Sequence, residues 1–162
     1  MGRLKRTLLL IGLLSLLVAI GQPVRADDRG SLEIAAGRTL SKEFPAIAVP
    51  MPLSDVSWDP NNCITAPWCD RLTLKVRVPA HPEDHRLTIK LEWLGGPQLT
   101  ASNQCYLYLW NDPQPLYPVR ESACVGDVAS IDFVPIKPTY QLVVRNFTAT
   151  KSTGYRLKLI YE

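Results

Sequence analysis

Alternation of apolar and polar residues is strict in two stretches of the chain. These are residues 72–78, "LTLKVRV", and residues 86–93, "RLTIKLEW". The apolar positions are Leu72, Leu74, Val76 and Val78 in the first stretch and Leu87, Ile89, Leu91 and Trp93 in the second. A period of two is typical of a β-strand with one buried face, so we predict two half-buried strands joined by the polar turn "PAHPEDH".

Further strands are predicted on both sides of this pair. They cover "CYLYLW" (residues 105–110), residues 119–124, "SIDFV" (130–134), "YQLVVRN" (140–146), "YRLKLIY" (155–161) and one short strand from Leu32 to Leu40. The 14 prolines and nine glycines supply turns, and no convincing amphipathic helix follows residue 26. Seven or eight short strands favour an all-β antiparallel β-sandwich, either jelly-roll or immunoglobulin-like.

A proline-rich stretch separates the first strand from the others. Prolines at positions 45, 50, 52, 60 and 67 recur too often for a helix or a central strand. We therefore expect a single domain, in which residues 27–70 supply an N-terminal strand and a proline-rich segment held by a disulfide, and residues 71–162 form the main part of the sandwich.

The first 26 residues have the pattern of a cleaved secretory signal: a basic start, an apolar stretch from Leu8 to Ile20, and small residues near Ala26. The apolar stretch is shorter than the roughly 18 residues of a membrane-spanning helix, and no second span follows. Cleavage would remove four of the 18 basic residues and none of the 15 acidic ones, leaving a net charge of −1. This balance argues against nucleic acid as a partner.

Four cysteines in an exported chain of about 136 residues predict two disulfides. Three pairings are possible, and the simplest joins Cys63 to Cys69 and Cys105 to Cys124. Zinc is the alternative, but the four cysteines contain no closely spaced pair of the kind that zinc sites use.

The residues from "YLYLWND" (106–112) to "GYRLKL" (154–159) resemble the bacterial pre-peptidase C-terminal domain, as in exported proteins of actinobacteria built around one such domain. The resemblance lies in a Leu-Tyr-Leu strand, a serine-containing strand, "YQLVV" and a closing Gly-Tyr-x-Leu strand. It implies a jelly-roll-like sandwich with a non-catalytic role, in some cases binding calcium or matrix polymers. Where the family often has two acidic residues leading into the strand, this chain has Gln104 and Tyr106, which weakens the calcium expectation.

The aromatic face of the 105–110 strand is the first candidate ligand site. Parity places Cys105, Leu107 and Leu109 on one face, and the other face carries Tyr106, Tyr108 and Trp110. This aromatic row could stack against sugar rings or a polymer. The favoured alternative is that residues 113–118, with Leu116 and Tyr117, fold over the row and bury it.

Several weaker candidates have plain structural alternatives. Oxygen donors for calcium are gathered at Asp55, Asp59, Asn61, Asn111 and Asp112, but such residues also suit any turn. His81 and His85 have the spacing of a metal pair on a helix, yet Pro82 places them in a turn. Asn146 begins an "NFT" glycosylation motif, which we expect to be unmodified in a bacterial protein.

No catalytic motif is evident, so we predict a non-catalytic binding or accessory module without a cofactor. We expect it to be a monomer outside the cell or at the envelope, with an extracellular polymer or protein as its partner. One alternative is a hydrolase with an unrecognised site. The other is a secreted inhibitor of proteases that presents Trp68 on the loop between Cys63 and Cys69 as an anchor for a partner's pocket.

Overall fold

The computed structural model describes residues 27–47, 63, 66, 68–94, 105–111, 117–146 and 154–162. The predicted signal segment lies outside these residues. The strands are β1 (Asp27–Ala35), β2 (Arg38–Pro45), β3 (Cys69–Arg77), β4 (Leu87–Leu94), β5 (Cys105–Asn111), β6 (Arg120–Ala123), β7 (Val128–Phe133), β8 (Thr139–Asn146) and β9 (Gly154–Tyr161). Within this part of the chain, no helix is long and apolar enough to cross a membrane.

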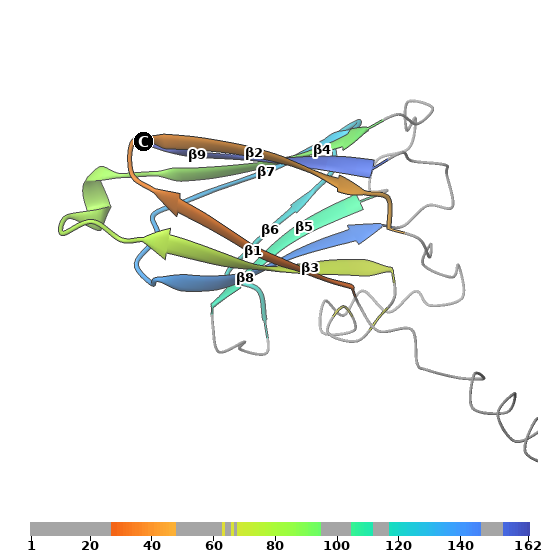
Figure 1. The fold of residues 1–162 in the computed structure, drawn as a ribbon, viewed down its shortest axis with the longest axis horizontal. Coiled ribbons are helices and arrows are strands. Elements are labelled where there is room, and N and C mark those ends of the chain that lie inside the picture. Colours follow the sequence, from red (N-terminus) through yellow and green to blue (C-terminus); the bar gives the residue numbers. More distant parts are fainter. Residues whose placement is uncertain are drawn as a thin grey trace, which may run out of the picture.

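The strands form two sheets packed face to face (Figure 1). One sheet has the order β1-β3-β8-β5-β6 and the other has the order β2-β9-β4-β7. From β2 to β9 the chain changes sheets at every connection except β5 to β6, which is the jelly-roll arrangement. The predicted all-β sandwich is confirmed, and the strand order selects the jelly roll over the immunoglobulin-like topology.

The N-terminal strands differ from the single strand expected between Leu32 and Leu40. A turn at Gly37, whose φ is 74°, divides this stretch into β1 and β2, which join different sheets. A positive φ suits glycine because other residues meet steric strain there. β1 pairs with β3 in parallel, whereas the other strand pairs are antiparallel. The sandwich therefore includes residues well before position 71.

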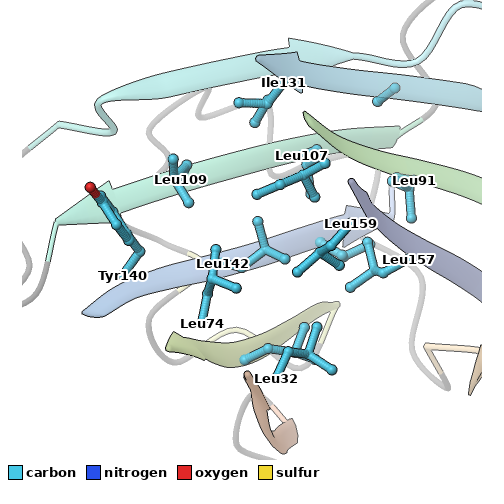
Figure 2. Packing of buried hydrophobic residues seen from close by; sticks show 14 of the residues in the cluster. Leu32, Leu74, Leu91, Leu107, Leu109, Ile131, Tyr140, Leu142, Leu157 and Leu159 are labelled. Atoms are coloured by element: carbon cyan, nitrogen blue, oxygen red, sulfur yellow. The ribbon is translucent and has the colours of Figure 1, made fainter. Parts of the chain in front are cut away.

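The core lies between the sheets and uses the apolar positions that alternation predicted. Figure 2 shows leucines of both sheets pointing toward one another, with Leu107, Leu109 and Leu142 on one side and Leu91, Leu157 and Leu159 on the other. All of these side chains are buried. Burial of one leucine contributes about 1.5–3 kcal/mol, so this layer is the main source of stability.

A polar cluster interrupts the core at one end of the sandwich. Asp70 is only 1% exposed, and its Oδ2 lies 2.9 Å from Nε of Arg29. The hydroxyl of Tyr155 donates a hydrogen bond of 2.8 Å to the same oxygen. The Tyr155 ring stacks between Phe44 and Trp93, with centroid distances of 5.1 and 5.8 Å. This arrangement satisfies a buried carboxylate with both charge and hydrogen bonding.

Both predicted disulfides are present. Cys63 pairs with Cys69 and Cys105 pairs with Cys124, with Cα atoms 5.4 and 5.3 Å apart. Cys105 lies among the core leucines, as the parity of β5 predicted. No described cysteine is free, which is consistent with an oxidising compartment.

Candidate functional site

The aromatic row of β5 lies on the outer face of the five-stranded sheet and is covered. Tyr108 is 3% exposed, Trp110 is fully buried, and Tyr106 is partly buried. The rings are neighbours along the strand, with centroids 5.6 Å apart for Tyr106 and Tyr108 and 5.3 Å apart for Tyr108 and Trp110. Ligand contact by Tyr108 or Trp110 would therefore require their cover to move.

The described part of the cover comes from the segment around the small disulfide. Cys63, Ala66 and Cys69 pack on Tyr108 and Trp110 in a second, smaller apolar cluster. The disulfide holds this small loop at the start of β3, two strands from β5 in the same sheet. Tyr117, from the segment that we expected to fold back, is instead 73% exposed. Residues 112–116 lie outside the described residues.

Arg145 of β8 is buried on the same face as the aromatic row. Burial raises the pKa of Tyr108 to about 12, although a hydrogen bond and the positive charge of Arg145 act in the opposite direction. The tyrosine is thus neutral over the whole physiological range. This environment is typical of a packed scaffold with an internal polar contact.

Trp68 packs partly buried against the same cluster. The inhibitor hypothesis requires this ring to be available as an anchor, but much of its surface already contacts its own domain. The structure therefore gives Trp68 a role in covering the row, and its contact with a partner stays a prediction.

The described surface has a hollow at the end of the sandwich opposite to the Asp70 cluster, where β5 ends and β6 and β8 begin. Its volume is about 350 Å³, near the lower limit for small-molecule sites. It is lined by Arg86, Asn111, Val119, Arg120, Asp132, Phe133, Val134, Ile136 and Tyr140. The C terminus lies at this end, because Arg86 and Glu162 exchange backbone hydrogen bonds (Figure 1).

The apolar part of the hollow is held in place by Tyr140. Its ring packs edge to face on Phe133, with centroids 5.2 Å apart. Its hydroxyl accepts hydrogen bonds from the backbone N–H groups of Ile136 and Lys137, at 2.9 and 3.0 Å. These bonds fix the segment that follows β7, so one wall of the hollow is preformed.

The charged part of the hollow is net positive. Two arginines and one aspartate line it, and Asp132 accepts a hydrogen bond from Thr88. Among the described residues, neither Arg86 nor Arg120 has a carboxylate within ion-pair distance. Two guanidinium groups without an ion-pair partner among the described residues, beside an apolar floor, make a site that favours an anion, with the acidic Glu162 adjoining Arg86 through paired backbones.

Ile136, on the wall of the hollow, is 69% exposed, and the exposed Tyr117 lies two residues before Val119. Of the residues around the hollow, the sequence indicated only Asn111, as a calcium ligand, and Tyr117, as part of the cover of the aromatic row. The missed signal is weak, because Arg86 and Arg120 are ordinary strand-end residues until the fold brings them together.

Of the five residues proposed as calcium ligands, Asn111 alone lies among the described residues, so the calcium site stays a prediction. Asn111 lines the hollow together with Arg86 and Arg120, whose charges oppose a cation. Asp55, Asp59, Asn61 and Asp112 lie outside the described residues. In the described part of the chain, no three His, Cys, Asp or Glu residues are grouped as metal ligands.

The histidines occupy a turn, as the sequence indicated. A short 3-10 turn spans Pro82–Asp84, and Nδ1 of His81 lies 3.3 Å from Glu83 Oε1 on the surface. His85 instead packs edge to face on Tyr161, with centroids 5.9 Å apart. The two histidines therefore have separate environments.

Asn146 is the last residue of β8, and the rest of its "NFT" motif lies outside the described residues.

In the described part of the chain, the fold and the hollow together define a small jelly-roll domain with a recess at one end. A scan against protein-family models found no match, and a search of curated proteins also found none.

Two solved structures have a similar fold. One is the pre-peptidase C-terminal domain of collagenase from Bacillus anthracis, at 11% identity and a TM-score of 0.46, covering 85% of this chain and 98% of that chain. The other is PliG, a periplasmic lysozyme inhibitor of g-type lysozyme from Aeromonas hydrophila, at 13% identity and a TM-score of 0.44, covering 85% of this chain and all of that one. The first of these two structures is a domain of the family that the sequence resembles.

Proposed function

We propose that this chain is an exported, non-catalytic binding module that docks a partner protein on the hollow formed by β5, β6, β7 and β8. The observation that carries the proposal is the combination of an exposed Ile136 with two arginines that have no carboxylate partner among the described residues, at one recess. Aromatic residues and arginine are enriched where proteins bind one another, and exposed Tyr117 adds to this surface.

Export is supported by two features. Residues 1–26 have the pattern of a secretory signal, and four cysteines form two disulfides. Disulfides persist in the periplasm and outside the cell and are rare in the cytosol. A partner protein would therefore be an extracellular or envelope protein.

Site-specific photo-crosslinking tests the docking surface. A photoreactive amino acid replaces Ile136 in one variant and Val125 in a matched control. Val125 is 85% exposed but precedes the first residue of β7, whereas the hollow lies at the last residues of that strand. Each variant is incubated with envelope and secreted proteins of the source organism. A distinct adduct formed from position 136 and not from position 125 supports the proposal, whereas equal labelling or no adduct at 136 contradicts it.

The non-catalytic part of the proposal has its own test. We expect the purified chain to leave a panel of esters, glycosides and peptides unchanged. Turnover that co-purifies with the chain through several separations, and that disappears when the chain is unfolded, would instead support the hydrolase alternative.

A further inference from the structure

We infer that the hollow recognises an aspartate or glutamate side chain of the partner, next to an apolar side chain, with Arg86 and Arg120 as the carboxylate-binding pair. This inference rests on the proposed function, because it names the chemistry of the partner at the same site. It commits to an acidic side chain within a peptide segment as the occupant.

The positions of the two arginines carry the first step. Arg120 is the first residue of β6, an edge strand of one sheet, and Arg86 immediately precedes β4 in the other sheet. Both line the hollow, so positive charge reaches it from both layers of the sandwich. Nη1 of Arg120 donates to the carbonyl oxygen of Val119 at 2.8 Å, which leaves other guanidinium donors for a ligand.

A carboxylate is the anionic group that an unmodified partner protein presents. Asp132 also lines the hollow, so an incoming anion meets one negative charge as well as two positive ones. A doubly charged phosphate would be attracted more strongly by the arginines and repelled more strongly by Asp132, so the choice of a carboxylate rests on the peptide nature of the partner and not on the charge balance. The planar guanidinium fork can bind the two oxygens of a carboxylate in parallel, and Asn111 offers an additional amide donor.

The rest of the hollow predicts what stands beside the carboxylate. Val119, Phe133 and Ile136 provide an apolar surface at the same recess. Because Tyr140 already holds the backbone at Ile136 and Lys137, binding would cost little ordering of this wall. A volume of about 350 Å³ has room for one or two side chains rather than a folded element.

The test uses a phage-displayed library of random 12-residue peptides as the probe, selected on the intact, oxidised chain. We expect the selected peptides to share an acidic residue next to an apolar one. Synthetic versions with asparagine or glutamine at the acidic position should bind at least about tenfold more weakly, as expected for loss of charged hydrogen bonds.

Substitutions on the chain provide the complementary measurement. Arg86→Gln and Arg120→Gln should each weaken peptide binding at least about tenfold, and binding should fall as salt is raised. Arg77→Gln is the matched control, because Arg77 is exposed, does not line the hollow and should change affinity less than about twofold. Unchanged urea midpoints establish that the variants fold. If one does not, Arg120→Lys keeps the charge without the planar fork and should bind with intermediate affinity.

The outcomes separate the inference from the function on which it rests. An adduct at position 136 together with peptides that do not need an acidic residue overturns the inference and leaves the proposed function standing. Loss of binding when only the peptide's C terminus is amidated assigns the carboxylate to the chain end and also overturns it. Binding of polygalacturonate, but of no peptide, through the same arginines overturns both the inference and the protein partner.

Discussion

Replacing Asp70 with alanine removes the oxygen on which two interior side chains converge. Oδ2 of Asp70 lies 2.9 Å from Arg29 Nε and accepts a 2.8 Å hydrogen bond from Tyr155. Tyr155 is fully buried, so its hydroxyl cannot turn to water when the acceptor is removed. Removing one partner of a buried ion pair costs about 3–5 kcal/mol, and we expect the lower end of this range here because the Arg29 side chain is 19% exposed.

The predicted cost is a large share of the stability of an ordinary domain, which is about 5–15 kcal/mol. Tyr155→Phe keeps the stacked ring and removes only the hydroxyl, so we expect it to cost less, about 2 kcal/mol. The double variant should cost less than the sum of the two single variants by about 1 kcal/mol or more, since both remove the same hydrogen bond.

Urea unfolding followed by tryptophan fluorescence measures these differences at constant m-value. Asp84→Ala is the matched control, because Asp84 is exposed in the turn after β3 and should change the free energy of unfolding by less than about 0.5 kcal/mol. The reasoning is refuted if Asp70→Ala destabilises the chain no more than the control does. Strict additivity with Tyr155→Phe would refute the energetic role of the hydrogen bond alone.

Three further predictions follow from the outer face and from β9. Because burial raises the pKa of Tyr108 from 10.0 to about 12, the unfolded chain ionises first, and the stability that the neutral side chain contributes is lost as the pH rises from about 10 to about 12. Tyr108→Phe should reduce that loss by on the order of 2 kcal/mol in urea titrations across this range, and an unchanged pH profile would contradict the burial. Gly154→Ala should cost more than about 2 kcal/mol in the same assay, because φ is 152° and a Cβ would overlap a carbonyl oxygen of β2, whereas Gly126→Ala, which meets no atom within 4 Å, should cost less. Replacing Cys63 and Cys69 with serine should cost about 2 kcal/mol and increase iodide quenching of tryptophan fluorescence, an increase that should shrink when Trp110 is also replaced by phenylalanine.

Alternation predicted the strands well where one face is apolar throughout. β4 occupies Leu87–Leu94, within one residue of the predicted 86–93 at each end, and Leu87 and Trp93 are buried as expected. β3 was predicted to start at Leu72 but begins at Cys69, because the preceding pair Asp70 and Arg71 carries no apolar signal. Asp70 faces inward only because Arg29 and Tyr155, distant in sequence, are there to meet it.

The cover of the aromatic row shows a different limit. Parity correctly separated Tyr108 and Trp110 from the core leucines, and the rarity of large exposed apolar patches favoured a covered row over a bare one. Neither could identify the covering segment, because a strand's own sequence does not say which distant loop packs on its face. The small disulfide of Cys63 and Cys69 was predicted as a clamp, but its position above β5 depends on β3 and β8 lying in the same sheet.

The hollow follows from the way in which the jelly roll brings two sheet edges together. β6 and β7 are the edge strands of their sheets, and the backbone N–H of Ser130 donates to Ser122 Oγ at 3.2 Å across the gap between them. Two residues further along each strand, Arg120 and Asp132 line the hollow without an ion pair between them. Charged residues at sheet edges also prevent association of edges between molecules, which is a sufficient reason for them in many proteins. The two roles differ in their consequences. If Arg120 protects the edge, Arg120→Gln should promote self-association, whereas if Arg120 recognises a ligand, the variant should stay a monomer and bind the selected peptides more weakly. The position of Arg86 favours recognition, since it belongs to neither edge strand and yet adds its charge to the same recess.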